Sequence, residues 1–402
     1  MRSLRILLPL ATLVLAAVSF VPVAHGIPAF AQRYGGSCRR CHHPFPRLTA
    51  AGEAFASNGL RRHGETAPVD TIGTGDDRLV LGRALPLSMR FESNVTWQGG
   101  EHDAPVTDFQ TPYALKVISS APLSKDLSYY FYFYFFEHGE IGIEDATVTW
   151  NDLGGRPFDL TVGQFQLSDP LFKRELRLEL EDYVAYRARV GGTRADLTYD
   201  RGLLATWSPA RWEFAFAAVN GTGKREADDG ENFDTDAPKN VLARASFDAA
   251  EGVRVGGMAF AGWQDGSGPP DARVRADARM AGADFSLSRG AWELNGQWLA
   301  RRDRLATFTP GEPATTTRGG FLEAIWAPGD ARWYGFGLWN RLDCDRPLLD
   351  PRMGGPVDVT RYQTFSAGLG HSLQRNVRLQ AEAGWDTESE RARLALSFVT
   401  AY

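Results

Sequence analysis

Two cysteines and a histidine lie close together near the start of the chain, in the heptapeptide SCRRCHH at residues 37–43. Cys38, Cys41 and His42 follow the pattern C-x-x-C-H, the attachment signature of a c-type haem. At this spacing the two thiols can add to the porphyrin vinyl groups as thioethers, and the next imidazole reaches the iron from one face. The sequence therefore predicts one covalent haem c, with Cys38 and Cys41 as anchors and His42 as an axial ligand.

Other chemistry at this motif stays open. In an exported chain Cys38 and Cys41 could instead form a disulfide, whereas zinc fits less well because no second cysteine or histidine pair lies at zinc-finger spacing. His63 is a candidate for the sixth ligand of the iron, with a solvated loop histidine or an open sixth position as alternatives. His43 is too close to His42 to reach the opposite face. The sequence holds no Ser-His-Asp set, phosphate-binding loop or zincin motif, so no other catalytic residues are predicted.

The residues before this motif have the pattern of an export signal. Arg2 and Arg5 form a basic amino end, a long apolar run follows, and the tripeptide AHG places small residues at a cleavage site. The pattern predicts a signal peptide over residues 1–26, with a retained membrane anchor as the alternative. The mature chain would then lie outside the cytoplasm of a Gram-negative bacterium.

The composition of the remaining chain favours strands over membrane helices. Mean hydropathy is −0.29, 23% of residues are charged and 12% are aromatic, and no later stretch approaches the roughly 20 continuous apolar residues of a spanning helix. A membrane barrel accounts for these values, since half of each strand faces water, half faces lipid, and aromatic residues gather at both interfaces. The net charge of −5 speaks against a strongly basic, nucleic-acid-binding protein.

Apolar and polar residues alternate with a period of two from about residue 86 onward. In NVRLQAEAGWD, for example, Val377, Leu379 and Ala381 share one face, and Arg378 and Gln380 share the other. Such segments predict sixteen strands, at residues 86–97, 109–120, 126–137, 141–151, 158–165, 202–208, 211–219, 239–248, 252–262, 277–288, 291–301, 317–327, 331–341, 360–373, 376–386 and 390–402. An even strand number is typical of bacterial outer-membrane barrels.

The connections between these segments alternate in length. Short ones such as SPA, DAAE, RG, APGD and QR come between mostly longer polar ones, as in barrels with short periplasmic turns and long outer loops. The last segment, RARLALSFVTAY, ends on an aromatic residue and resembles the terminal strand of such barrels. We therefore predict an all-β fold over residues 81–402, a transmembrane antiparallel β-barrel of about sixteen strands, with a soluble β-sandwich as the alternative.

One predicted outer connection, residues 166–201, is long and strongly charged. It is the third on the outer side, and its size and charge favour a loop that folds into the lumen as a constriction. A further strand pair over residues 182–200 is the alternative. The opposing charges are Arg174, Arg177, Arg187, Arg189 and Arg194 against Glu175, Glu179, Glu181 and Asp182.

Residues 27–80 are predicted to form a small domain of their own. A helix is expected over residues 48–62, where Leu48, Ala51 and Phe55 repeat at helical spacing and could lay an apolar face on the haem. A segment this short needs a covalent or metal-based staple to be stable, and the haem would supply it. The expected architecture is therefore a helical c-type cytochrome plug ahead of the barrel.

The segment IPAFAQRYGGSCRRCHHPFPRLTAAGEAFASNGLRR, followed by a strand-rich chain, resembles the fused monohaem cytochrome–porins of the outer membrane, whose best-known members are iron(II) oxidases. The resemblance is specific over about residues 27–65, and SDPLFKRELRLELEDY is also similar to this group. It implies a haem that passes electrons between an extracellular donor such as Fe(II) and periplasmic c-type cytochromes, from a barrel surrounded by outer-membrane lipid.

Carried over by position, the resemblance makes Cys38 and Cys41 the haem anchors and His42 the axial ligand. The Arg39-Arg40 pair and His43 are not typical of the family, so the reduction potential and the direction of electron flow stay open.

Two function classes follow from these observations. The first is electron transfer, as an iron(II):cytochrome oxidoreductase, and the second is a transport channel in which the cytochrome is a structural plug or a redox gate. Acidic loops at residues 137–140 and 226–236 could gather divalent cations, but ordinary solvated loops are the simpler interpretation. Cys344 is expected in a loop.

Overall fold

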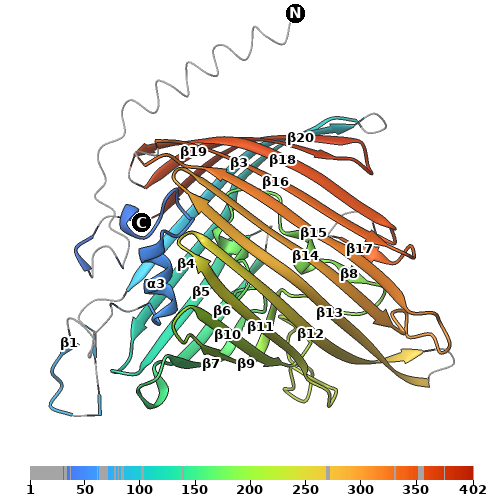
Figure 1. The fold of residues 1–402 in the computed structure, drawn as a ribbon, viewed down its shortest axis with the longest axis horizontal. Coiled ribbons are helices and arrows are strands. Elements are labelled where there is room, and N and C mark those ends of the chain that lie inside the picture. Colours follow the sequence, from blue (N-terminus) through green and yellow to red (C-terminus); the bar gives the residue numbers. More distant parts are fainter. Residues whose placement is uncertain are drawn as a thin grey trace, which may run out of the picture.

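In the computed structural model, sixteen antiparallel strands close into a barrel, which confirms the predicted strand number and barrel class (Figure 1). The described residues are 30, 34–36, 38–60, 62, 71–76, 78–79, 81–82, 86–100, 104–137, 140–268, 272–329, 332–351, 357–374 and 376–401. The barrel strands are β3 (Leu87–Gly100), β4 (Val106–Pro122), β5 (Leu127–Glu137), β6 (Glu140–Trp150), β7 (Phe158–Gln166), β9 (Tyr199–Trp207), β10 (Trp212–Val219), β11 (Asn240–Ala250), β12 (Val253–Gly268), β13 (Ala272–Arg289), β14 (Trp292–Arg304), β15 (Thr315–Trp326), β16 (Trp333–Cys344), β18 (Arg361–Gln374), β19 (Val377–Asp386) and β20 (Arg391–Ala401).

Neighbouring strands of the wall follow one another in the chain, and the last strand pairs with the first. β20 and β3 pair antiparallel, with Leu396 opposite Val95, so the sheet has no free edge. Closure removes the unpaired backbone groups that a lipid environment could not satisfy. Each predicted strand corresponds to one barrel strand, although several are longer than predicted, such as β12 and β13.

Two short strand pairs lie outside the barrel sheet: β1 (Thr71–Ile72) with β2 (Leu81–Gly82), and β8 (Arg189–Val190) with β17 (Leu349–Asp350). None of the helices among the described residues is long and apolar enough to cross a membrane.

The two ends of the barrel differ in their connections. At the short-turn end, strands are joined by the brief connections 123–126, 151–157, 208–211, 251–252, 290–291, 327–332 and 375–376. At the long-loop end, the extended connections are 167–198, 220–239, 305–314 and 345–360. The asymmetry agrees with the prediction, although four connections at the long-loop end are also brief, at 101–105, 138–139, 269–271 and 387–390. Both α3 and the carboxyl terminus lie at the short-turn end, on the left in Figure 1.

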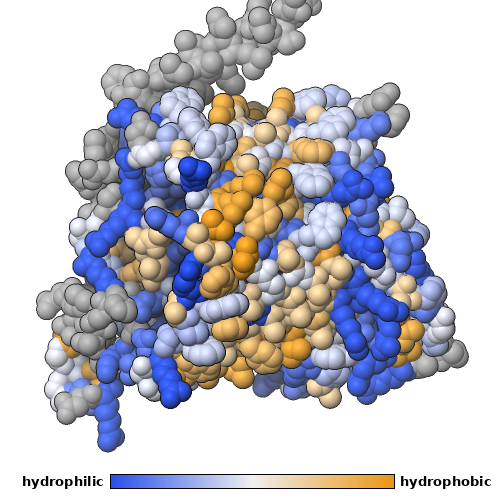
Figure 2. Space-filling model, viewed as in Figure 1, coloured by the Kyte–Doolittle hydropathy of each residue, from blue (hydrophilic) through white to orange (hydrophobic). Residues whose placement is uncertain are grey.

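The outer wall carries an apolar band bounded by tryptophans. All eleven tryptophans of the chain lie on barrel strands, at positions whose side chains point away from the lumen. The group near the short turns is Trp150, Trp207, Trp212, Trp292, Trp326 and Trp333, and the group nearer the long loops is Trp97, Trp263, Trp298, Trp339 and Trp385. Apolar residues gather in the middle of the face in Figure 2, with hydrophilic surface toward both ends. Such a band between aromatic girdles is how a barrel faces lipid.

The loop 167–198 folds into the lumen, as predicted. Tyr183 in this loop is fully buried and stacks on Phe321 of β15, with ring centroids 4.2 Å apart. Asp182 forms ion pairs with Arg174, with Arg177 at 3.5 Å and with Arg187 at 3.4 Å. The alternative strand pair over 182–200 is wrong, because this stretch holds only the short helix α4 (Val184–Arg187), the two-residue strand β8 and the first two residues of β9.

The prediction for Cys344 is also wrong. This residue ends strand β16 and is buried in a cluster with Val190 and Leu349 inside the barrel, rather than lying in a loop. The strand continues past the predicted end because Asp343 and Cys344 still pair with β15.

Candidate functional site at the short-turn end

The C-x-x-C-H motif lies in a compact turn that leads directly into helix α3 (Ala50–Ser57). Cys38 begins the short helix η1 (Cys38–Arg40), and the amide of Thr49 donates to the carbonyl oxygen of Cys41 at 2.8 Å. The Thr49 hydroxyl also accepts from the Gly52 amide at 3.2 Å, as an N-cap residue does. The chain thus folds back on itself between the motif and the helix.

A hydrogen bond to the backbone fixes the orientation of the His42 ring. Its Nδ1 lies 2.8 Å from the carbonyl oxygen of Pro46. Because a carbonyl oxygen can only accept, Nδ1 carries the proton and donates, which makes Nε2 the unprotonated nitrogen of the neutral ring. Burial lowers the pKa of His42, which keeps the imidazole neutral, although the Pro46 hydrogen bond opposes this shift. A neutral imidazole oriented through Nδ1 is the form in which histidine binds a metal.

Cys41 carries a free, half-buried thiol. Burial raises the pKa of this thiol, and the charges of Arg40 and Arg62 act against the rise. The disulfide alternative also depends on the side chain of Cys38 and stays a prediction. The side chain of Cys38 and all of His63 lie outside the described residues. Among the described residues, no three histidine, cysteine or acidic side chains gather as a metal site; His138 of the loop 137–140 lies outside these residues.

Helix α3 is packed tightly against the motif. A Cβ atom on Gly52 would lie 2.2 Å from the carbonyl oxygen of Cys41, so only glycine permits this approach. The predicted helix over 48–62 is observed in a shorter form; Ala51 is exposed and Gly52 is buried, and the apolar face toward a haem stays a prediction. Phe55 meets Phe30 and Tyr34 edge to face, each at 5.4 Å between ring centroids.

Residues of this segment contact the barrel at its short-turn end. His43 Nε2 lies 3.0 Å from the carbonyl oxygen of Pro328, and Arg39 donates to the Gly329 carbonyl at 3.1 Å. Both acceptors belong to the turn between β15 and β16. On β19, Arg378 donates to the carbonyl oxygen of Phe45 at 2.6 Å.

Arg47 reaches furthest into the lumen. It pairs with Glu293 at the start of β14, and its Nη1 lies 3.7 Å from Oε2 of Glu323, whose side chain is fully buried. The other oxygen of Glu323 accepts from the Tyr183 hydroxyl at 2.6 Å. One carboxylate therefore joins the N-terminal segment to the lumen loop. Sequence reasoning missed Arg47, since nothing in the local pattern indicates a partner so distant in the chain.

The comparisons with known proteins concern the barrel fold. No protein-family model and no curated protein matches the chain. An anion-selective porin from Comamonas acidovorans superposes with a TM-score of 0.56 at 10% identity, covering 79% of this chain and 99% of that one. The outer membrane channel DcaP of Acinetobacter baumannii gives 0.53 at 11%, covering 79% and 96%. A porin structure gives 0.52 at 16%, covering 79% and 100%. At such identities the likeness establishes a porin-like barrel fold.

Proposed function

We propose that this chain is an outer-membrane barrel that carries one haem c at its short-turn end and transfers electrons through it. The donor would be extracellular Fe(II) or another reductant, and the acceptors periplasmic c-type cytochromes. Placement in the outer membrane is supported by the apolar outer band, the two tryptophan groups and the porin-like fold. As in the resemblance to fused cytochrome–porins, residues 27–80 would be the cytochrome plug, at the periplasmic mouth.

The observation that carries the haem assignment is the geometry of His42. In the C-x-x-C-H pattern this residue is the axial ligand, and its Nδ1 contact to Pro46 leaves Nε2 for the iron. Cys38 and Cys41 precede His42 at the C-x-x-C spacing that attachment by two thioethers requires. The bound haem would supply reversible one-electron transfer at its iron. The protein residues would hold it: Cys38 and Cys41 covalently, and His42 by its oriented imidazole.

A second candidate is a channel whose N-terminal segment is a structural plug or a redox gate. The structural comparisons favour this candidate more directly than electron transfer, because the matched proteins are porins and an outer membrane channel. The lumen holds both the aromatic cluster of Tyr183, Tyr186 and Phe321 and the charged cluster around Asp182, and either candidate can contain this combination.

Reconstituted holoprotein separates the two candidates. With Fe(II) added on the long-loop side of proteoliposomes, electron transfer predicts rapid reduction of the haem absorbance bands, together with no solute conductance in planar bilayers. A haem that responds to no outside donor, in a barrel that conducts ions, would overturn electron transfer and support the channel. The haem-free variant Cys38→Ser, Cys41→Ser is the matched control, because it keeps the barrel and removes the thioether anchors.

A further inference from the structure

The outer wall of the barrel near the long loops carries a cluster of arginines that the proposed electron transfer does not use. We propose that Arg279, Arg302 and Arg318 bind the phosphate groups of a phosphorylated glycolipid in the outer leaflet of the membrane. The proposal rests on the outer-membrane placement above and is independent of the haem.

These three arginines lie on neighbouring strands and point away from the lumen. On β13, Ala278 and Met280 belong to the cluster inside the barrel, so Arg279 between them faces outward. Arg302 of β14 lies directly opposite Arg279 in the sheet register. On β15, Arg318 is the next outward residue after Thr316, which lies opposite Arg302. Side chains in such positions are direct or diagonal neighbours on one face of the sheet.

The charges in this cluster are not balanced by the protein. Asp277 is shared between Arg304, at 2.6 Å, and Arg279, at 3.6 Å. Arg302 and Arg318 are exposed, and neither forms an ion pair within the part of the chain that the structure describes. Like charges directly opposite each other destabilise a sheet, so the Arg279–Arg302 pair favours binding of an anion from outside. Guanidinium groups bind phosphate through paired N–H donors.

The height of the cluster on the wall matches that of lipid headgroups. Trp298 belongs to the tryptophan group nearer the long loops, and Arg302 lies two outward positions beyond it on β14. Tryptophans mark the boundary between hydrocarbon and headgroups in a membrane barrel. Trp263 of the same group lies opposite Asp277, next to Arg279, so the cluster lies at the boundary between hydrocarbon and headgroups, on the side with the long outer loops, where the outer leaflet would be.

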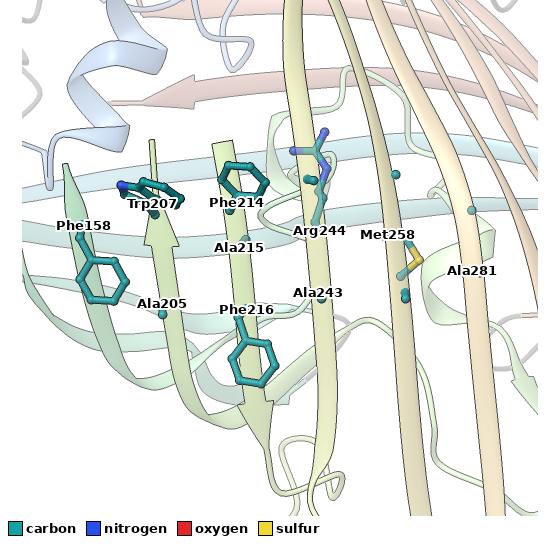
Figure 3. A pocket seen from close by; sticks show the side chains of 14 residues that line it. Phe158, Ala205, Trp207, Phe214, Ala215, Phe216, Ala243, Arg244, Met258 and Ala281 are labelled. Atoms are coloured by element: carbon teal, nitrogen blue, oxygen red, sulfur yellow. The ribbon is translucent and has the colours of Figure 1, made fainter. Parts of the chain in front are cut away.

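A shallow apolar groove lies beside the cluster and can take an acyl chain. Ala243, Ala259, Ala281 and Ala300 lie opposite one another in a row across four strands, and Arg318 follows Ala300 in the same row. These small side chains leave a depression on the outer wall. Ala243, Ala259 and Ala281 line the groove that Figure 3 draws, and Phe214 and Phe216 lie on its far side.

The groove and the arginines together select one class of ligand. An acyl chain lying on the alanine row would place a phosphate at the hydrocarbon boundary, next to Arg302 and Arg318. Figure 2 shows apolar surface in the middle of the visible face and hydrophilic surface toward its right end. A lipid with several acyl chains and more than one phosphate, such as lipopolysaccharide, fits this arrangement better than a zwitterionic phospholipid, since it carries more negative charge.

Native mass spectrometry of the delipidated holoprotein, titrated with rough lipopolysaccharide, tests the proposal. Dephosphorylated lipopolysaccharide, phosphatidylethanolamine and inorganic phosphate are titrated in the same way as comparison ligands. The variant is Arg302→Ser with Arg318→Ser. The matched control is Arg156→Ser with Arg289→Ser, which removes two exposed arginines at the short-turn end.

We expect the double variant to bind lipopolysaccharide at least tenfold more weakly, because charge-assisted hydrogen bonds to phosphate are lost, while the control stays within twofold. Dephosphorylation should weaken binding to the wild type to a similar degree. Ala281→Trp, which fills the groove and keeps every arginine, should also weaken binding of the lipid.

Three results would each overturn the proposal: unchanged binding by the double variant, equal binding of dephosphorylated lipid, or inorganic phosphate binding as tightly as the lipid. The haem absorbance spectrum is recorded on the same samples. An intact spectrum with failed lipid selectivity removes the lipid site alone, whereas a missing haem with intact lipid selectivity removes the haem proposal alone.

Discussion

In the barrel wall, strands such as β12 and β13 pair residue by residue from Val253 to Gly268, whereas residues 38–60 are held to the wall by scattered single contacts. Backbone ladders fix the wall wherever the period-two pattern persists, whatever the individual side chains are. The N-terminal segment depends on particular residues, such as Gly52 and Arg47. The strand ladders of the wall therefore depend mainly on the period-two pattern, whereas the position of the N-terminal segment depends on a few individual residues.

The largest expected effect comes from Cys41→Ala. Removing one thiol leaves at most one thioether, so the covalent pyridine haemochrome should be lost or shifted to the single-thioether spectrum. The barrel should remain folded, as judged by its heat-modifiable electrophoretic mobility. Cys344→Ala, which removes a buried cysteine of the wall, is the control and should keep the haem. A normal two-thioether spectrum in Cys41→Ala would refute the anchor assignment.

Asp182→Asn should affect the barrel interior without touching the haem. Three arginines surround this carboxylate, and losing it leaves buried positive charge uncompensated, which costs about 3–5 kcal/mol. Thermal unfolding in detergent should shift clearly downward with an unchanged haem spectrum. Asp229→Asn, in an exposed part of the loop 220–239, should leave the unfolding temperature where it is. Equal unfolding temperatures for both variants would mean that the ion cluster does not hold the lumen loop.

Arg47→Gln changes a contact between the N-terminal segment and the barrel wall. It removes the cationic partner of buried Glu323, which keeps its hydrogen bonds from Tyr183 and Asn295, so we expect a cost of about 1.5–3 kcal/mol. The N-terminal segment should become more sensitive to protease, and conductance in planar bilayers should rise if this segment closes the mouth. Arg78→Gln removes a charge from the same segment without a contact to the wall in the described residues. Identical behaviour of the two variants would contradict a specific role for Arg47.

Gly52→Ala has the smallest expected effect of the four. The added methyl group would collide with the backbone of Cys41, and overpacking of this kind costs about 1–3 kcal/mol. Haem incorporation should fall while barrel stability is unchanged. Gly73→Ala serves as the control, because nothing lies within 4 Å of the added atom. Full haem loading in Gly52→Ala would show that α3 can move away from the motif at little cost.

Much of the wall could be predicted because its signal is local. In NVRLQAEAGWD, the alternation of apolar and polar residues predicted the start of β19 to within one residue. The starts of most other strands were predicted equally closely. The ends of β12, β13 and β16 were missed, since polar residues such as Arg273 and Asp343 continue the ladder beyond the apolar pattern. The helix was predicted, but its buried residue was not, because glycine carries no hydrophobic signal.

The candidate site was predictable in its motif and not in its surroundings. The spacing of Cys38, Cys41 and His42 predicts a haem c, and this stays a prediction. The Nδ1 contact to Pro46 and the pairing of Arg47 with Glu323 depend on how the chain folds back, and neither has a local pattern.

The sequence by itself determined the number of strands, the two faces of each strand and the haem motif, because periodicity and short spacing are properties of neighbouring residues. Only the tertiary structure decided what these pieces contact. Barrel closure and register bring Arg279, Arg302 and Arg318 together on the outer wall, and place Glu323 within reach of Arg47 in the lumen. The register between paired strands brings together residues that are distant in the chain. This register is set when whole strands pair, so no local sequence pattern specifies it.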